Sequence, residues 1–207
     1  AGEPFLRAEG TAAALHMAWK VSLNLCDHLS GVATKTRAIV DAAHSANSAC
    51  EVLTTRKSMP GVKDLLTKAV TCGGAFPHRL GASETVLVFD HHITFMGGFE
   101  AFLEALPALR GRCVEKKLFV EAGPDEARRL AKAGVDGIQL DKMPVDDLAA
   151  LVPELRAIDP HLTLIAAGGI NLQNAAAYAA TGVDGLATTA PFTAKPIDMS
   201  VRMKRAE

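Results

Sequence analysis

Aromatic side chains and an excess of positive charge are both scarce in this sequence. Of its 207 residues, 5% are aromatic, and 22 Lys and Arg against 23 Asp and Glu give a formal net charge of −1. This balance excludes a nucleic-acid binder that works through bulk electrostatics, because such a protein needs a clear basic excess. The apolar content of 49% is carried mainly by Ala, Val and Leu, which suits helices packed on a buried parallel sheet.

Long apolar runs and paired cysteines are also missing. No run approaches the about 18 apolar residues of a membrane span, and residues 1–10, which include Glu3 and Glu9, lack the basic-then-apolar order of a signal peptide. The cysteines are far apart, without a C-x-x-C motif: Cys26, Cys50, Cys72 and Cys113. We therefore expect reduced core thiols in a cytoplasmic protein with no membrane or nucleic-acid partner, and neither a disulfide framework nor a zinc site.

Short apolar runs alternate with helical stretches along the chain. A strand is expected at 4–9, then a helical region from Thr11 to about Ala46 with a break at Ser30-Gly31. Six later runs are expected to be strands, at 50–55, 85–90, 117–121, 137–141, 162–167 and 185–189. Helices are expected to begin near Pro60, Gly98, Pro124, Pro144 and Asn171. The alternation predicts βαβ units and a parallel sheet covered by helices.

An internal repeat helps to choose between a closed barrel and an open doubly wound sheet. Residues 133–138 (AGVDGI) recur as residues 181–186 (TGVDGL), each after an Ala-rich helix and before a strand. Gly134 and Gly182 stand where a left-handed helix end is wanted. Such repeats are typical of barrel quarter units, although open sheets contain them too. Since no G-x-G-x-x-G follows the first strand, the sequence favours a parallel α/β barrel.

Polar side chains gather at the expected carboxyl ends of the strands, where parallel barrels carry their reacting groups. They are Arg56, Lys57, Asp90, His91, His92, Glu121, Asp141, Lys142, Thr188 and Thr189, and the loop before the second strand adds His78 and Arg79. The early strands thus supply cations and the middle strands acids, an arrangement that would suit a phosphorylated, anionic substrate. Neighbouring histidines seldom chelate one ion, so the pair after Asp90 is expected to be hydrogen-bonded in a loop.

Arg56 and Lys57 offer a planar fork for a carboxylate and a point charge for a phosphate. The alternative is a solvated basic pair. Glu121 and Asp141 end apolar strands, where a charge costs free energy unless it is paired or metal-bound. They indicate ribose hydroxyls or a divalent cation as partners, or else ion pairs with Lys57 or Lys142.

Gly168 and Gly169 form a turn after the next-to-last strand, just before Asn171 as a helix N-cap. Glycines let the backbone approach a phosphate, the N–H groups of a helix start point at it, and barrels place phosphate sites after their last two strands. The alternative is a plain tight turn.

Together, these residues resemble the quinolinate phosphoribosyltransferase (carboxylating nicotinate-nucleotide pyrophosphorylase) family from about Gly10 to Ser200. The matching motifs are Leu29-Ser30-Gly31-Val32-Ala33-Thr34, Thr55-Arg56-Lys57, Cys72-Gly73-Gly74, His78-Arg79, Asp90, Val120-Glu121, Leu140-Asp141, Gly168-Gly169-Ile170 and Gly182-Val183-Asp184. The resemblance implies a homodimer with shared active sites and an incomplete six-stranded α/β barrel. It makes residues 1–10 a remnant of an N-terminal sheet domain otherwise lost by truncation, 11–47 linking helices, and 48–207 the barrel phosphoribosyltransferase domain.

The family's site residues can be carried over position by position. By resemblance, Arg56, His78 and Arg79 would hold the carboxylates of a pyridine, and Lys57 would contact the pyrophosphate of phosphoribosyl pyrophosphate (PRPP). Glu121 and Asp141 would face the ribose and its Mg²⁺, Gly168, Gly169 and Thr189 would hold phosphate, and Lys20 would reach into the partner's site. Lys57, Glu121 and Asp141 would be the catalytic set, supporting loss of pyrophosphate, attack by the pyridine nitrogen, and release of CO₂.

Several positions depart from the family pattern. Lys20 stands in place of Arg, Phe89 in place of Lys, Phe119 and Ile165 in place of acids, Ala167 in place of Ser, Lys142 in place of Asn, and Thr189 in place of Gly. The departures resemble the molybdenum-transport-associated, ModD-like branch. They predict PRPP-dependent transfer to quinolinate or a related anionic heterocycle. One alternative is a phosphosugar isomerase or aldolase in which Lys57 acts as the general base or forms a Schiff base with the substrate. The other is a non-catalytic protein that senses a nucleotide or an oxyanion such as molybdate.

Overall fold

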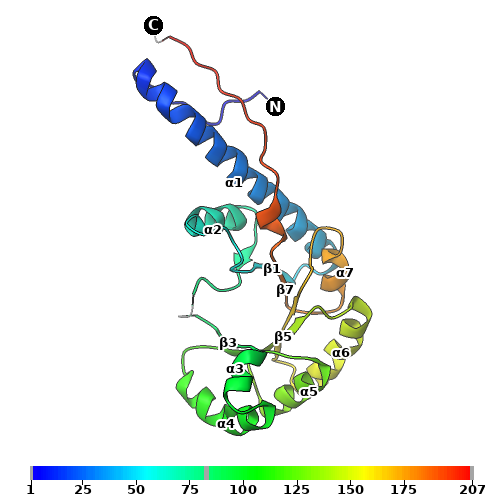
Figure 1. The fold of residues 1–207 in the computed structure, drawn as a ribbon. Helices are drawn as coiled ribbons and strands as arrows, with labels where there is room; N and C mark the ends of the chain where they lie inside the picture. The colour runs from blue at the N-terminus through cyan, green and yellow to red at the C-terminus, as the bar shows by residue number, and fades with distance from the viewer. Residues whose placement is uncertain (1, 82–83, 206–207) are drawn as a thin grey trace.

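The computed structural model describes residues 2–81 and 84–205, which form a curled parallel sheet wrapped by helices (Figure 1). The helices are α1 (Ala12–Ala46), α2 (Lys63–Cys72), α3 (Asp90–Phe95), α4 (Phe99–Arg112), α5 (Pro124–Ala133), α6 (Val145–Ile158), α7 (Ala175–Ala180) and the 3₁₀ turn η1 (Ala190–Thr193). The strands are β1 (Glu51–Thr54), β2 (Phe76–Pro77), β3 (Val86–Val88), β4 (Leu118–Glu121), β5 (Gly137–Asp141), β6 (Thr163–Ala167) and β7 (Gly185–Thr188).

The sheet runs β2-β1-β7-β6-β5-β4-β3, and every neighbouring pair is parallel. Because β2 and β3 are its two edges, the sheet curls without closing. The predicted incomplete α/β barrel is therefore confirmed, with seven strands in place of six. The additional strand, Phe76–Pro77, is too short to produce a period-2 pattern in the sequence.

Alternation along the strands divides the core in two. Side chains on one face pack under the helices, as Val120, Ile138 and Leu164 do. Those on the concave face form a smaller cluster, which we call the inner apolar cluster: Leu87, Phe119, Ile165, Ala167 and Ala187, with Leu53 and Phe89 packed against it. Successive strand residues point to opposite faces, so the last inward residue of each strand stands above this cluster, at the barrel mouth.

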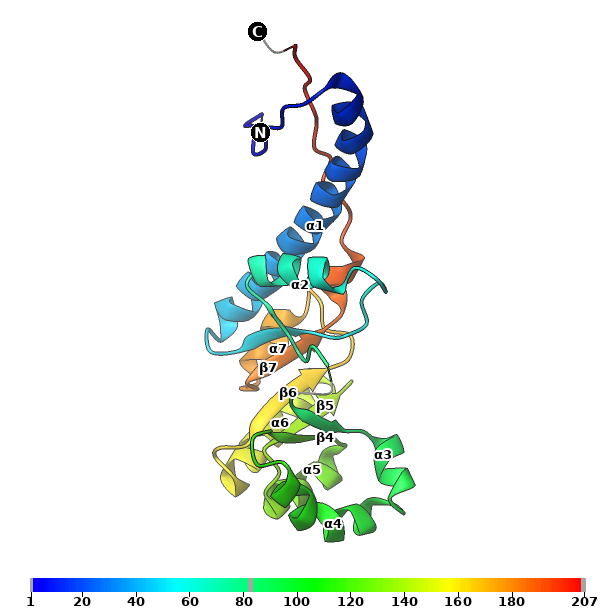
Figure 2. The ribbon, with the colours of Figure 1, turned by 90° about the vertical axis from the view of Figure 1, so that its left-hand side faces the viewer.

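α1 is one continuous helix, so the expected break at Ser30-Gly31 is wrong. The helix begins where Thr11 Oγ1 accepts a hydrogen bond from Ala14 N at 3.2 Å. Gly31 allows the backbone at Lys195 to approach α1 closely, because a Cβ there would overlap the backbone oxygen of Lys195. The C-terminal segment runs beside α1, with Ile197 N donating to Asp27 O at 2.9 Å (Figures 1 and 2).

Three other local expectations need correction. Residues 4–9 form no strand in the described part of the chain, since no neighbouring strand lies beside them to complete a ladder. All four cysteines are free, but only Cys50 is buried and Cys72 is exposed. The helix expected at Asn171 begins at Ala175, with Asn174 as N-cap. Among the described residues, no helix is long and apolar enough to cross a membrane.

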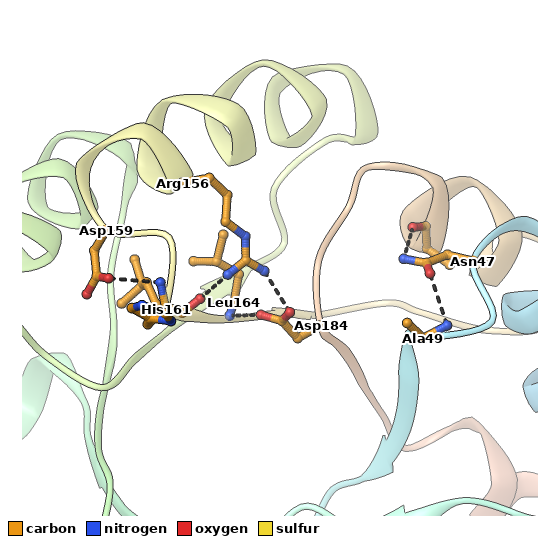
Figure 3. Close-up of polar contacts among 9 residues, drawn as sticks. Asn47, Ala49, Arg156, Asp159, His161, Leu164 and Asp184 are labelled. Atoms are coloured by element: carbon orange, nitrogen blue, oxygen red, sulfur yellow. Dashed lines mark hydrogen bonds and ion pairs between the residues drawn. The ribbon is translucent and has the colours of Figure 1, made fainter.

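The repeated Val-Asp-Gly segments make the same contacts twice at the amino ends of the strands. Asp184 Oδ2 accepts from Leu164 N at 2.6 Å, and its Oδ1 lies 2.6 Å from the guanidinium of Arg156 (Figure 3). Asp136 likewise accepts from Leu118 N at 2.7 Å and lies 3.5 Å from a guanidinium, that of Arg110. The predicted positive φ is confirmed at both glycines, 78° at Gly134 and 88° at Gly182. The repeat therefore serves the fold.

Candidate active site

Two arginines share a pocket of about 110 Å³ beside the carboxyl ends of β1 and β2. Arg56 and Arg79 line it together with Thr55, Ser58 and Lys63. Burial, together with the positive charge of Arg56, lowers the pKa of Arg79 from its usual value. Within the described residues neither guanidinium forms an ion pair, and the buried Nε of Arg79 has no hydrogen-bond partner. An anion in this pocket would supply both an ion-pair partner for the guanidinium groups and a hydrogen-bond acceptor for Arg79 Nε.

A buried amide links two of the predicted site residues. Gln139, on β5, donates from Nε2 to Glu121 Oε2 at 2.5 Å, and its Oε1 lies 2.9 Å from His78 Nε2. Since the amide donates to the carboxylate, its oxygen must accept from His78, which places the imidazole proton on Nε2. Burial lowers the pKa of His78, opposed by the Gln139 bond and aided by Arg79 and Arg56.

Gln139 was not among the residues expected from the sequence. It is only 6% exposed and lies between apolar neighbours on β5. A polar residue at an inward position of an otherwise apolar strand was the signal that could have found it, because such a group is rarely buried without partners.

Asp141 comes two residues after Gln139 on β5, so its backbone lies about 7 Å further along the strand. Glu121 pairs with Gln139 across the β4–β5 ladder. The two predicted carboxylates thus stand on adjacent strands at the same end of the barrel. Lys142 Nζ lies 3.7 Å from Asp141 Oδ2, so the expected ion pair with Lys142 is present, although exposed and long. The alternative partner Lys57 forms no ion pair within the described residues.

The Gly168–Gly169 turn has φ values of 86° and 74°. A Cβ at Gly168 would lie 2.6 Å from Lys142 N and 2.7 Å from Asp141 Oδ1, so only glycine lets the turn approach the Asp141 carboxylate. In the part of the chain that the structure describes, the amides of Gly168 and Gly169 have no acceptor. The N–H groups available to a phosphate are therefore those of the turn, because Asn171 N already donates to Asn174 Oδ1 at 2.8 Å.

Thr189 lies across the mouth from these acids, its Oγ1 2.8 Å from that of Thr55 at the end of β1. Thr188 is buried and donates to Ile170 O at 2.6 Å, which ties the glycine turn to β7. Lys57 is exposed in the loop after β1.

Three other predicted positions lie outside this group. Lys20 is exposed on the amino-terminal half of α1, which projects away from the barrel (Figure 2), and its Nζ lies 5.3 Å from the centroid of Trp19. Asp90 begins α3, and His92 Nδ1 accepts from Phe89 N at 3.0 Å. Of the two histidines expected to be hydrogen-bonded, only His92 has a hydrogen bond within the described residues, and the segment is a short helix instead of a loop.

A larger hollow of about 410 Å³ lies at the other end of the sheet, lined by Arg110, Lys117 and Asp136 among others. Lys117 directly precedes β4 and Asp136 directly precedes β5, so this hollow is remote from the carboxyl ends. Its lining belongs to the amino-end contacts of the repeat. We therefore place the functional site at the barrel mouth.

The donor set can be compared with the needs of a metal ion. No group of three or more His, Cys, Asp or Glu among the described residues could hold one. Mg²⁺, however, is commonly bound by one or two carboxylates while substrate phosphates and water complete its shell. Glu121 and Asp141 fit a site of that kind, but they do not fit a site in which protein side chains alone coordinate the metal.

The comparisons with known proteins agree with this geometry. A family model described as quinolinate phosphoribosyl transferase, C-terminal domain, matches residues 32–202. The chain is 44% identical over 176 residues to a Rhodobacter capsulatus protein named as pyrophosphorylase ModD, covering 84% of this chain and 67% of that protein. It is 36% identical over 190 residues to the carboxylating nicotinate-nucleotide pyrophosphorylase of Mycobacterium leprae, covering 91% of this chain and 65% of that protein.

Among solved structures, the nicotinate-nucleotide pyrophosphorylase of Francisella tularensis superimposes with a TM-score of 0.81 at 30% identity, over 91% of this chain and 65% of that one. The chain thus spans about two thirds of the length of these relatives. Since the family model covers most of the chain and the barrel matches, the protein belongs to the quinolinate phosphoribosyltransferase C-terminal domain family, with ModD-like pyrophosphorylases among its relatives.

Proposed function

We propose that this protein transfers the phosphoribosyl group of PRPP to a nitrogen heterocycle that carries a carboxylate, such as quinolinate. The observation that carries the proposal is the pocket of Arg56 and Arg79, which have no ion-pair partner in the described residues and lie at the same end of the barrel as Glu121 and Asp141. Cations for a flat acid and carboxylates for a sugar are what this transfer needs. Its relatives' names indicate the same chemistry.

The reaction asks for positioning and charge stabilisation, with no covalent nucleophile. The arginines would fix the acid so that its ring nitrogen faces C1 of the ribose, and the carboxylates of Glu121 and Asp141 would stabilise the positive charge that grows on the sugar as pyrophosphate leaves. Lys57, Thr189 and the amides of the glycine turn would bind the phosphates. Mg²⁺, held by Glu121 and Asp141 together with the pyrophosphate, would neutralise the leaving group.

A homodimer is part of the proposal. The projecting half of α1 exposes Met17, Val21 and Leu25, which lie at i, i+4 and i+8 on one side of the helix. An apolar stripe of this kind suits a second copy of the chain. Lys20, on the same half of the helix, would then be carried to the partner's site, since it is remote from the site of its own chain.

The structure disfavours one of the two alternative functions and leaves one observation in favour of the other. An aldolase-type mechanism needs a lysine desolvated in a pocket, whereas Lys57 is exposed, which disfavours this alternative. A binding protein without turnover is favoured by one observation, that Phe119 and Ile165 make the floor of the mouth apolar. Pyrophosphate release distinguishes this alternative from the enzyme.

Replacing Arg56 by Ala tests the proposed function. We expect acceptor affinity to fall by about ten- to 150-fold, because the bound carboxylate would lose a charge-assisted partner worth about 1.5–3 kcal/mol and would contact Arg79 alone. PRPP affinity should change much less. Titration calorimetry with PRPP, Mg²⁺ and quinolinate, followed by an assay of pyrophosphate release, gives both numbers. Arg37→Ala, an exposed arginine on α1, is the matched control. Unchanged turnover in Arg56→Ala would contradict the proposal.

A further inference from the structure

The barrel mouth has two chemically different sides. On one side lies the arginine pocket. On the other, Phe89 directly follows β3 as the N-cap of α3 and packs against the inner apolar cluster, whose members Phe119 and Ile165 are 5% and 3% exposed. The ring of Phe119 lies over Gly137 on the neighbouring strand, where a Cβ would be 2.5 Å from it. This side is therefore densely filled with apolar groups.

Phe89 joins the two sides. The guanidinium carbon of Arg79 lies 6.0 Å from the centroid of the Phe89 ring. A flat acid whose carboxylate reaches Arg79 thus lies with part of its ring beside Phe89. A cation–aromatic contact of this length favours positions of the Arg79 guanidinium beside the Phe89 ring.

The charges at the mouth limit what the acid can carry. The cations that line the pocket are Arg56, Arg79 and Lys63, whose Nζ donates to Leu80 O, whereas the members of the inner apolar cluster beside Phe89 are all uncharged. Burial lowers the pKa of His78, and its Nε2 donates a hydrogen bond to Gln139 Oε1, so this ring is already engaged by the link to Glu121. A second carboxylate on the ring would face Phe89 or the carboxylate of Glu121 and would be desolvated without a partner, which is strongly unfavourable.

From this arrangement we infer that the acceptor, in the function proposed above, is a nitrogen heteroaromatic ring with a single carboxylate, and that Phe89 is the residue that excludes a second one. The carboxylate binds between Arg56 and Arg79. The uncharged edge of the ring contacts Phe89. Quinolinate, with two adjacent carboxylates, is then the poorer ligand.

The test compares nicotinate, which has one carboxylate, with quinolinate on the same protein. We expect nicotinate to bind at least tenfold more tightly by titration calorimetry, and to support pyrophosphate release from PRPP with at least tenfold higher kcat/KM. In Phe89→Lys the preference should reverse by tenfold or more, because the new ammonium pairs with the second carboxylate. Phe95→Lys on α3 adds the same charge at an exposed position and should leave the preference unchanged.

Phe89→Leu keeps the inference testable if Phe89→Lys fails to fold. It keeps the apolar edge, so the preference for nicotinate should persist with weaker binding of both acids. Equal or tighter binding of quinolinate by the unmodified protein, or binding of neither acid, would overturn the inference. PRPP is titrated separately: failure to bind PRPP would refute the proposed function, whereas PRPP binding with a quinolinate preference would refute only the acceptor assignment.

Discussion

A single buried amide sets the direction of two hydrogen bonds at the proposed site. Gln139 donates to Glu121 and accepts from His78, so the three side chains have one consistent arrangement of hydrogens. The same bonds hold the Glu121 carboxylate toward the mouth. In an apolar environment such a network is stabilising only while every member is satisfied.

Acid should destabilise the free protein through His78. Its pKa is lowered in the folded state, so between that value and the usual value of about 6.5 the unfolded chain binds a proton that the native protein does not. Its contribution to stability is therefore present above about pH 6.5 and is lost as the pH falls. We expect urea unfolding to show a steeper loss of stability from pH 7 to 5 in the unmodified protein than in His78→Gln. Identical slopes would contradict the assignment; His92, also lowered, is common to both proteins.

Thiol reactivity should separate Cys50 from Cys72. Burial, followed by the charges of Asp184 and Glu51, raises the pKa of the Cys50 thiol to about 12. Since only the thiolate reacts, Cys50 should resist a disulfide reagent at pH 8 in the native protein. Exposed Cys72 should be labelled fastest, ahead of the half-buried Cys26 and Cys113, and Cys72→Ser should remove this fastest phase. Rapid labelling of Cys50, found by peptide mapping, would show that the amino end of β1 opens readily.

Repeated elements explain how the strands are aligned at their amino ends. Each repeat Asp accepts from the first residues of a preceding strand and contacts an arginine near the end of a preceding helix. The sequence alone could predict the turn and the strand that follows, because Gly and apolar runs act locally. It could not predict the arginine partners, 26 to 28 residues earlier, because only the tertiary fold brings them near.

The two repeats should differ in their contribution to stability. Asp184 lies 2.6 Å from a guanidinium that is 29% exposed, whereas Asp136 lies 3.5 Å from one that is 45% exposed. Asp184→Ala should therefore lower the free energy of unfolding by about 2–3 kcal/mol, since the Leu164 amide and Arg156 both lose a partner. Asp136→Ala should cost about 1 kcal/mol less. Chemical denaturation of both variants measures the difference, and a larger loss at Asp136 would refute this ranking.

At the scale of the whole molecule, periodicity predicted the parallel barrel because βαβ order restricts the topology strongly. It failed where a residue's role depends on a distant segment. Gly31 indicated a helix break, but it makes room for the backbone at Lys195. The presence of Arg56 and Arg79 in one pocket follows from strand ends meeting at one rim, whereas the Gln139 link and the contact of Arg79 with Phe89 depend on the tertiary fold.

The two edge strands of the open sheet also bear on how the protein avoids aggregation. An exposed strand border can recruit foreign chains, which add to it as extra strands. Here the two borders are Phe76–Pro77, where proline has no N–H to offer, and the three-residue Val86–Val88. Neither edge strand is long enough to pair stably with a strand of another chain, so the sheet can stay open without promoting fibril formation.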